Sequence, residues 1–261
     1  QLESTQKMSV YPAESETLSA DTAQLQRELR QARAELEEFT YSVSHDLRAS
    51  LRHVTAYVQI IQEDLDDQVS AEIRGHLTTV SQAAQTMSRQ IEALSRLSRL
   101  GRVEIHWTAC HLNELLSDAI ADLIPMPRQE PLVWEVATDF PALWGDAALI
   151  QQLLAELLSN AVKFTHHTPH ATVRVSWALN DAGHCVVTVS DNGAGFNPQY
   201  QSKLFHAFQR LHSAREFPGL GMGLALCRKI MARLGGEIGA EGEIGGGCRV
   251  SFTLPLARTA L

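Results

Sequence analysis

The sequence predicts an α+β protein in two parts, a long helical hairpin followed by a sandwich of helices and strands. Two observations carry this prediction. Apolar residues recur alternately four and three positions apart through most of residues 18–94, which is the heptad pattern of paired helices. Beyond Gly101 the pattern becomes a mixture of short strand-like runs and helical runs. We therefore divide the chain into a linker (1–17), a helical hairpin (18–100) and a second domain (101–261).

The heptad runs place two long amphipathic helices in the first part, joined by a polar turn around Asp66–Ser70. Two steps of four adjoin at Val43, which is a local phase shift of the heptad, or stutter. The seam residues are Leu18, Thr22, Leu25, Leu29, Ala32, Leu36, Phe39 and Val43, then Leu47, Leu51, Val54, Val58, Ile61 and Leu65, and in the second helix Ile73, Leu77, Val80, Ala84, Met87, Ile91 and Leu94.

One hairpin leaves its apolar stripe half covered. Pairing with a second copy would complete a four-helix bundle, so we expect a homodimer in which the first helix also forms a coiled coil. A long helical spacer would show the same pattern, and the seam does not separate the two interpretations.

The second domain is expected to alternate short strands and helices. Asp146 is a plausible N-cap for a helix that runs to Val162, and Asn180–Gly183 is a turn between two strands. The other expected elements are strands at 103–106, 132–136, 142–144, 172–179, 185–190, 237–240 and 248–254, and helices at 112–123 and 220–234.

Composition narrows the class of protein. A net charge of -8 and a pI near 5.8 argue against a nucleic-acid partner, because phosphate backbones attract an excess of Lys and Arg. The four cysteines are far apart, without the spacing of a metal site or disulfide framework, and indicate buried thiols in a reducing compartment. They are Cys110, Cys185, Cys227 and Cys248.

No apolar run approaches the roughly 20 residues needed to cross a bilayer, and no secretion signal is present. We expect a cytoplasmic piece without a membrane segment. Because the chain begins at Gln1 rather than Met, we expect an upstream sensory domain outside this sequence, through which the full-length protein could be tethered to a membrane.

Three motifs in the second domain suggest a nucleotide site. The turn Asp191–Phe196, with Gly193 and Gly195, offers a carboxylate at a strand end for an exocyclic amine such as that of adenine. The segment 219–224 opens a helix with three glycines, Gly219, Gly221 and Gly223, and its backbone N–H groups suit phosphates. Taken alone, these patterns are also those of a turn and of a loop before an ordinary helix.

The third motif lies on one helix face. Glu156, Asn160 and Lys163 are four and three residues apart, and a carboxylate, an amide oxygen and an ammonium suit Mg²⁺ and phosphates. A solvated polar stripe would have the same spacing.

The order of these motifs resembles the N, G1, F and G2 boxes of sensor histidine kinases, whose ATP-binding domain has the Bergerat, or GHKL, fold. Phe205 and Phe208 are similar to the F box of that family's ATP lid, and residues 39–48, around His45, resemble its H box. The segment Phe208–His212 is similar to the phytochrome-like branch. The likeness covers about residues 20–255.

The resemblance implies roles for named residues. His45 would be the phosphoacceptor, Asp191 would hold the adenine amine, Asn160 would bind Mg²⁺ and Glu156 would support that ion through water. Lys163 would meet phosphate oxygens of ATP. The three glycines of 219–224 would shape the lid hinge and triphosphate site, and Phe208 would belong to the lid. The expected function is ATP-dependent autophosphorylation of His45, followed by transfer to an aspartate on a response regulator receiver domain.

Helix geometry supports His45 independently. It lies two residues from both Val43 and Leu47, about 200° from each seam residue, and should point outward where a nucleotide domain can reach it. Neutral imidazole offers a lone pair for in-line attack on phosphorus. Asp46 could hydrogen-bond the other ring nitrogen, fix the tautomer and accept the proton. A surface histidine without function is the alternative reading, and His53 lacks the motif.

Four positions depart from the family pattern. Ser50 replaces the usual Pro, which favours a straighter first helix. Ala49 replaces the Thr or Asn associated with phosphatase activity, and because a methyl group cannot orient water we predict weak or absent phosphatase action. Leu220 and Cys248 replace hydroxyl-bearing residues near the nucleotide, which predicts weaker ATP affinity.

Two alternatives remain at this stage. A Bergerat-fold ATPase acting as a conformational clamp would hydrolyse ATP without a phosphoenzyme, and it leaves the H box without a purpose. A dimeric scaffold would bind ATP or partners and transfer nothing. The sequence does not name the stimulus or the cognate regulator, and it does not tell whether transfer occurs within a subunit or between subunits.

Overall fold

The computed structural model describes most of the chain, which divides into two compact units, residues 1–99 and 100–261. The described ranges are 11–64, 70–123, 131–213 and 215–257. The predicted turn at Asp66–Ser70 lies outside the described residues except for Ser70.

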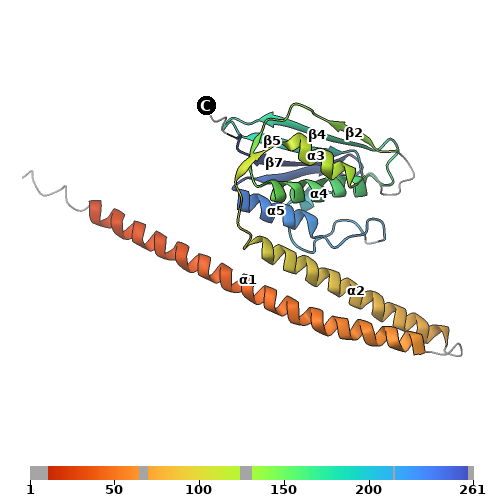
Figure 1. The fold of residues 1–261 in the computed structure, drawn as a ribbon. Coiled ribbons are helices and arrows are strands. Elements are labelled where there is room, and N and C mark those ends of the chain that lie inside the picture. Colours follow the sequence, from red (N-terminus) through yellow and green to blue (C-terminus); the bar gives the residue numbers. More distant parts are fainter. Residues whose placement is uncertain (1–10, 65–69, 124–130, 214, 258–261) are drawn as a thin grey trace, which may run out of the picture. The chain divides into compact units, whose positions relative to one another are not determined.

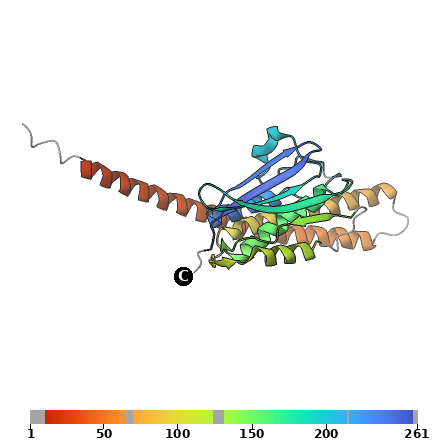
Figure 2. The ribbon, with the colours of Figure 1, turned by 90° about the horizontal axis from the view of Figure 1, so that it is seen from above.

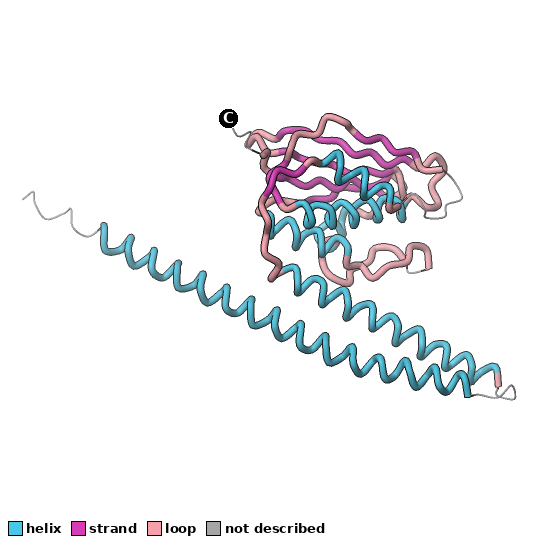
Figure 3. Tube along the Cα trace, viewed as in Figure 1, coloured by secondary structure: helices cyan, strands magenta, loops and turns pink. Residues whose placement is uncertain are grey.

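The first unit is a hairpin of two long helices, α1 (Tyr11–Asp64) and α2 (Ala71–Leu100). They run antiparallel and side by side along the second half of α1 (Figures 1 and 3). The helix begins inside the segment that we predicted as a loose linker, and only residues 1–10 lie outside the description. Pro12 does not prevent this start, because proline is tolerated in the first turn of a helix, where its missing N–H has no partner to lose.

The contact between the two helices uses only part of the predicted seam. Leu51, Ala84 and Ile91 form a buried cluster. Ser44 and Val58 lie seven residues to either side of Leu51, and they are buried as well, so this heptad faces α2. Other seam residues of the hairpin are left exposed, among them Leu47, Val54, Ile61, Val80 and Met87.

Polar contacts fix the register of the hairpin. The Ser98 hydroxyl donates to the Glu37 carbonyl oxygen at 2.8 Å, and the Arg48 guanidinium donates to the Ser95 hydroxyl at 3.0 Å. These two pairs lie on either side of His45 along α1. They join positions 61 and 47 residues apart, so the rotation of α1 about its axis is set by α2 on both sides of the histidine.

The second unit is a five-stranded sheet with its helices on one face, as the α+β prediction required (Figures 1 and 2). The strand order is β2-β4-β5-β7-β6, with β2 parallel to β4 and the other pairs antiparallel. The strands are β2 (Val133–Val136), β4 (Thr172–Leu179), β5 (Cys185–Asp191), β6 (Ile238–Glu243) and β7 (Gly247–Leu254), and the helices are α3 (Leu112–Ala121), α4 (Ala147–Phe164) and α5 (Gly223–Leu234).

One predicted strand was wrong. Residues 103–106 form no strand, and the chain instead pairs β1 (Thr108–Cys110) with β3 (Leu143–Gly145) as a separate two-stranded sheet. The reason is burial: Cys110 packs inward opposite Leu143, whereas Val103 is exposed. The position of a three-residue strand is set by the strand with which it pairs, because three residues are too few to show a clear alternation of apolar and polar side chains.

The helix α4 is the centre of the core and also carries the polar motif. The Asp146 carboxylate caps it by accepting the Leu149 N–H at 3.0 Å, and its other oxygen accepts the His106 N–H at 2.8 Å. Leu153, Leu154 and Leu158 are fully buried beneath the sheet. The predicted N-cap is confirmed, and it anchors the helix that presents the polar face to the site.

Candidate functional site

His45 lies exposed in the middle of α1, with 65% of its side chain accessible to solvent. Its Nδ1 is 3.2 Å from Oδ1 of Asp46. With the proton on Nδ1 shared with this carboxylate, Nε2 carries the lone pair on the solvent side of the ring. The neighbouring Ser44 is buried at 1% exposure and donates to the Thr40 carbonyl, so the helix turns its small residue inward and its imidazole outward.

The helix continues without a break past His45. Ser50, which stands where the family has proline, keeps its backbone N–H, and its hydroxyl donates to the Asp46 carbonyl at 3.3 Å. Ala49 is half-buried and offers no hydrogen-bonding group. The imidazole is therefore presented by a regular helix, with Asp46 as its hydrogen-bonding neighbour.

The polar face of α4 meets the start of α5. The Lys163 ammonium donates to Oδ1 of Asn160 at 3.1 Å. A Cβ atom on Gly223 would lie 2.7 Å from Oε2 of Glu156 and 3.4 Å from Nδ2 of Asn160, so the helix start lies directly against these two side chains. The structure thus brings together two of the three sequence motifs, the polar helix face and the glycine-rich helix start.

The third motif, the turn after β5, joins the same region through backbone contacts. Oδ1 of Asp191 accepts the Gly193 N–H at 2.8 Å. A Cβ on Gly193 would lie 2.4 Å from the Phe164 carbonyl oxygen at the end of α4. Gly195 has a φ of +60°, and a Cβ there would overlap the Glu243 carbonyl oxygen at 1.8 Å. Both glycines are required by close backbone approach.

Burial perturbs two ionisable groups of this region. It raises the pKa of Asp191 from 3.8 to about 6, although the N–H groups of Gly193 and Cys248 act in the opposite direction. The pKa of Lys163 is lowered, first by burial and then by the nearby Arg210 charge, while Glu156 opposes the shift. Two cations held close together indicate a site suited to an anion such as a phosphate chain.

The glycines of the predicted lid hinge have different contacts. Gly219 has a φ of +150°, and a Cβ there would lie 3.5 Å from Nζ of Lys163, while Gly221 has a φ of +71° and faces the Gln209 carbonyl oxygen. Phe205 is buried. Among the described residues, Phe208 makes no hydrogen bond or ring contact with the other predicted site residues; its side chain is 42% exposed and its φ is +62°.

The residues present suit Mg²⁺ that is carried by a nucleotide. Glu156 and Asn160 carry oxygen atoms that could ligate the ion: Oε2 of Glu156 faces the glycine-rich helix start, and Oδ1 of Asn160 accepts from Lys163. Within the described ranges, no group of three or more His, Cys, Asp or Glu is arranged to hold a metal by itself. Mg²⁺ commonly combines one or two protein oxygens with substrate phosphates and water, so this sparse set fits the ion.

Sequence reasoning missed three groups of this site. Arg210 lies close enough to Lys163 to lower its pKa. The Cys248 backbone N–H donates to the Asp191 carboxylate, a role that depends on strand pairing rather than on the side chain. His212 contacts the turn Asp191–Phe196, the predicted adenine turn, with Nε2 2.8 Å from the Gly195 carbonyl oxygen. The segment Phe208–His212 stood out in the sequence, but its spacing did not indicate what this histidine touches.

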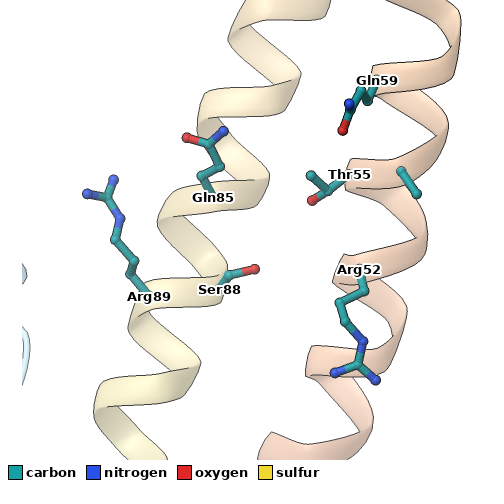
Figure 4. Close-up of a pocket in the computed structure, with 7 residues that line it drawn as sticks. Arg52, Thr55, Gln59, Gln85, Ser88 and Arg89 are labelled. Atoms are coloured by element: carbon teal, nitrogen blue, oxygen red, sulfur yellow. The ribbon is translucent and has the colours of Figure 1, made fainter.

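A polar groove of about 680 Å³ lies between the two helices of the hairpin (Figure 4). Thr55 of α1 and Ser88 of α2 point toward each other's helix across it, and Arg52 and Arg89 add positive charge. Arg52 follows His45 by seven residues, so it lies two turns, or about 10 Å, along the same side of α1.

Among the described residues, no helix is apolar enough over sufficient length to span a membrane.

A family model described as "Histidine kinase-, DNA gyrase B-, and HSP90-like ATPase" matches residues 145–258. Cyanobacterial phytochrome A of Nostoc sp. is 31% identical over 238 residues, covering 90% of this chain and 30% of the relative. The methanogenesis regulatory histidine kinase FilI of Methanothrix harundinacea is 32% identical over 228 residues, covering 87% and 25%. The chain therefore spans less than a third of the length of these relatives.

Solved structures agree with the fold. The full-length ShkA structure in complex with AMPPNP superposes with a TM-score of 0.62 at 25% identity, covering 86% of this chain and 47% of that one. The histidine kinase AdeS of Acinetobacter baumannii gives a TM-score of 0.56 at 16% identity, covering 82% and 98%, and supports the fold alone.

Proposed function

Because the chain belongs to the sensor histidine kinase family, we propose that it transfers the γ-phosphoryl group of Mg-ATP to His45 and then to an aspartate of a response regulator. The observation that carries the proposal is the state of His45. It is exposed, and its Nδ1 lies against Asp46, so Nε2 is left as the nucleophile. We further propose that the chain acts in the cytoplasm as a homodimer, with the exposed apolar seam as its interface.

The transfer step follows from this arrangement. The Nε2 lone pair of His45 attacks the γ-phosphorus in line with the bond to the β,γ-bridging oxygen. A P–N bond forms, that P–O bond breaks, and ADP leaves with the bond's electron pair. Asp46 stabilises the positive charge that develops on the imidazole by holding the Nδ1 proton. An aspartate oxygen of the receiver then attacks the same phosphorus, and the neutral imidazole is restored.

The second unit supplies the groups that would hold the nucleotide. Asp191 would accept a hydrogen bond from the adenine amine, and Lys163 with Arg210 would face phosphate oxygens. Glu156 and Asn160 would hold Mg²⁺, which neutralises charge on the phosphates when it is bound. Gly193 allows the turn after β5 to approach the Phe164 carbonyl at a distance that a side chain would block.

Labelling with γ-³²P-ATP tests the proposal. We expect label that is lost in acid and stable in alkali, and that is absent from His45→Gln, while ATP binding is retained in that variant. Asn160→Ala should lose both label and nucleotide binding, whereas Asn113→Ala should keep both, because Asn113 only donates to the Thr138 carbonyl. ATP hydrolysis without a labelled protein would support the clamp alternative, and binding with neither outcome would support a scaffold.

The groove of Figure 4 is the surface that we expect the receiver to contact, because it begins two helical turns from the proposed phosphoacceptor and carries Arg52 and Arg89. Arg89→Ala should slow transfer from phosphorylated protein to the receiver. It should leave autophosphorylation unchanged, because this residue is remote in sequence from every motif of the nucleotide site. The matched control is Arg74→Ala, near the start of the same helix and outside the groove lining. Equal transfer rates for the two variants would rule out this contact surface.

A further inference from the structure

The lid histidine His212 is held in two independent ways. Its Nε2 is 2.8 Å from the Gly195 carbonyl oxygen in the turn that follows Asp191. Its ring also packs against two phenylalanines that contact each other, with centroid distances of 5.4 Å to Phe164 and 5.1 Å to Phe217. The side chain thereby contacts the end of α4, the adenine turn and the far side of the lid at once.

The acceptor of this hydrogen bond is fixed in place. Gly195 has a φ of +60°, and its backbone is so close to Glu243 and Gly247 that a Cβ would overlap their carbonyl oxygens at 1.8 and 2.8 Å. The preceding residue, Ala194, donates to the Phe164 carbonyl at 3.1 Å and accepts from the Gly245 N–H at 2.8 Å. The carbonyl that meets His212 therefore belongs to a rigid platform formed by three segments.

The lid side of the contact is tied down as well. Phe217 is buried at 5% exposure and packs 5.1 Å from Phe164 and 6.0 Å from His167. The Arg210 guanidinium donates to the Phe217 carbonyl oxygen at 2.8 Å. Moving His212 would thus also move the residues that carry Arg210, the cation next to Lys163.

These contacts continue to the phosphate end of the site. The Lys163 ammonium lies 4.4 Å from the centroid of the Phe164 ring, which also contacts the rings of His212 and Phe217. Nζ of Lys163 is also the nearest atom to a Cβ on Gly219, in the lid hinge, at 3.5 Å. A continuous path therefore joins the adenine turn, His212, Phe164, Lys163 and the lid hinge.

We propose that His212 is a positioning residue that sets the lid, through the Gly195 carbonyl and the Phe164–Phe217 ring pair, in the register that binds the nucleotide phosphates. The inference rests on the proposed nucleotide site. It assigns to His212 no contact with ATP and no part in the transfer step. Its function is to keep Arg210 and Lys163 at the spacing that the phosphate chain requires.

Three substitutions separate the two contacts. His212→Phe keeps a ring and removes the hydrogen bond, His212→Gln keeps an N–H donor and removes the ring, and His212→Ala removes both. Each single loss should weaken ADP binding about fivefold, and His212→Ala about twentyfold, because a hydrogen bond and an aromatic contact are each worth about 1 kcal/mol. The matched control is His206→Ala, an exposed histidine of the same lid, which should bind ADP as the wild type does.

Amide hydrogen exchange of residues 204–213 and 215–222 in nucleotide-free protein gives the decisive second readout. Exchange should rise in the order wild type, then His212→Phe and His212→Gln, then His212→Ala, while exchange in β4 and β5 stays unchanged. Autophosphorylation should show a raised KM for ATP with an unchanged rate at saturation. If wild-type protein bound no nucleotide, the proposed function would fail, and lid exchange would still test His212.

Two results would overturn the assignment. One is lid exchange and ADP affinity in His212→Ala equal to those of His206→Ala. The other is a uniform rise of exchange through the whole unit in all three His212 variants, which would assign the residue to general stability. If His212→Ala fails to fold, His212→Phe and His212→Gln decide the matter, because each retains one of the two contacts.

Discussion

The two units of the chain bury their apolar residues to different degrees. In the hairpin, Leu51, Val58 and Ile91 are buried, whereas large seam residues such as Leu47 and Val54 remain 47% and 43% exposed. In the second unit, residues such as Leu153 and Phe252 are fully enclosed between helices and sheet. The second unit thus has a complete core, and the hairpin presents a surface that a partner can complete.

The predicted site residues of the two units differ in exposure in the same way. His45 stands exposed on a regular helix, with Asp46 held against one ring nitrogen. Asp191 is half-buried, and burial raises its pKa to about 6. Under the proposed function, the acceptor that another domain must reach is kept open, whereas the groups that would recognise the nucleotide are held by close backbone contacts.

The largest expected effect is a loss of unfolding free energy when a side chain is added at a tightly packed glycine of the second unit. Gly195→Ala should cost about 4 kcal/mol of unfolding free energy or more, because its Cβ would overlap the Glu243 carbonyl at 1.8 Å. Gly183→Ala is the matched control: its φ of +74° is similar, but no atom lies within 4 Å of the added carbon, so about 1 kcal/mol is expected. Chemical denaturation measures both, and equal losses would mean that close packing at Gly195 is unimportant.

The second-largest effect is expected on self-association, when a charge is introduced into the exposed apolar seam of the hairpin. Val54→Glu places a charge in the proposed dimer interface and should weaken self-association about a hundredfold, because a buried carboxylate without a partner is costly. Thr78→Glu, on an exposed face of α2 away from the seam, should leave association unchanged. Analytical ultracentrifugation over a range of concentrations distinguishes them, and a monomeric wild type would contradict the comparison between the units.

Asp191 should make the second unit less stable as pH rises. Its folded-state pKa of about 6 exceeds the ordinary 3.8, so the folded protein binds this proton more tightly than the unfolded chain does. Stability from this group is therefore fully present below about pH 4, falls as pH rises to about 6, and is constant above that value. The total is at most about 3 kcal/mol.

Asp191→Asn removes this titration. At pH 8 it should raise the unfolding free energy by about 1–2 kcal/mol while weakening ATP binding, because it removes the cost of burying a charge together with the acceptor for the adenine amine. Asp181→Asn, in the exposed turn between β4 and β5, serves as the control. A pH profile of stability that is the same in wild type and Asp191→Asn would show that this carboxylate is not the source of the slope.

The smallest effect is expected for dephosphorylation of a partner. Ala49 has no group that could orient water, so loss of label from a phosphorylated receiver should be as slow with this protein and ADP as without them. Ala49→Thr places a hydroxyl one helical turn after His45, on the same face of α1. In this variant, loss of label from the receiver could become faster. Prompt acceleration by the wild type would contradict the prediction.

The sequence predicted best where local pattern and burial agree. The helix after Asp146 has its predicted cap, and its apolar residues occupy the core. The helix expected from residue 220 begins only at Gly223, because the glycines before it adopt positive φ values that an α-helix excludes. The α+β class followed from the change of periodicity, which is a property of long stretches rather than of single residues.

What could not be predicted depends on contacts between distant segments. The strand expected at residues 103–106 lies instead at Thr108–Cys110, because its partner is Leu143–Gly145. The donation of the Cys248 N–H to Asp191 follows from the pairing of β5 with β7, which no local motif encodes. His212 belongs to a segment that stood out in the sequence, yet its acceptor at Gly195 is visible only in the folded chain.

Locating the phosphoryl group within the imidazole of His45 tests the central claim most directly. Protein incubated with Mg-ATP can be studied by mass spectrometry to identify the residue and by ³¹P NMR to identify the ring nitrogen. Since Nδ1 lies 3.2 Å from the Asp46 carboxylate, we predict phosphorus on Nε2 of His45. Phosphorus on Nδ1, on His53, or on no residue of a protein that nevertheless binds ATP would contradict the account.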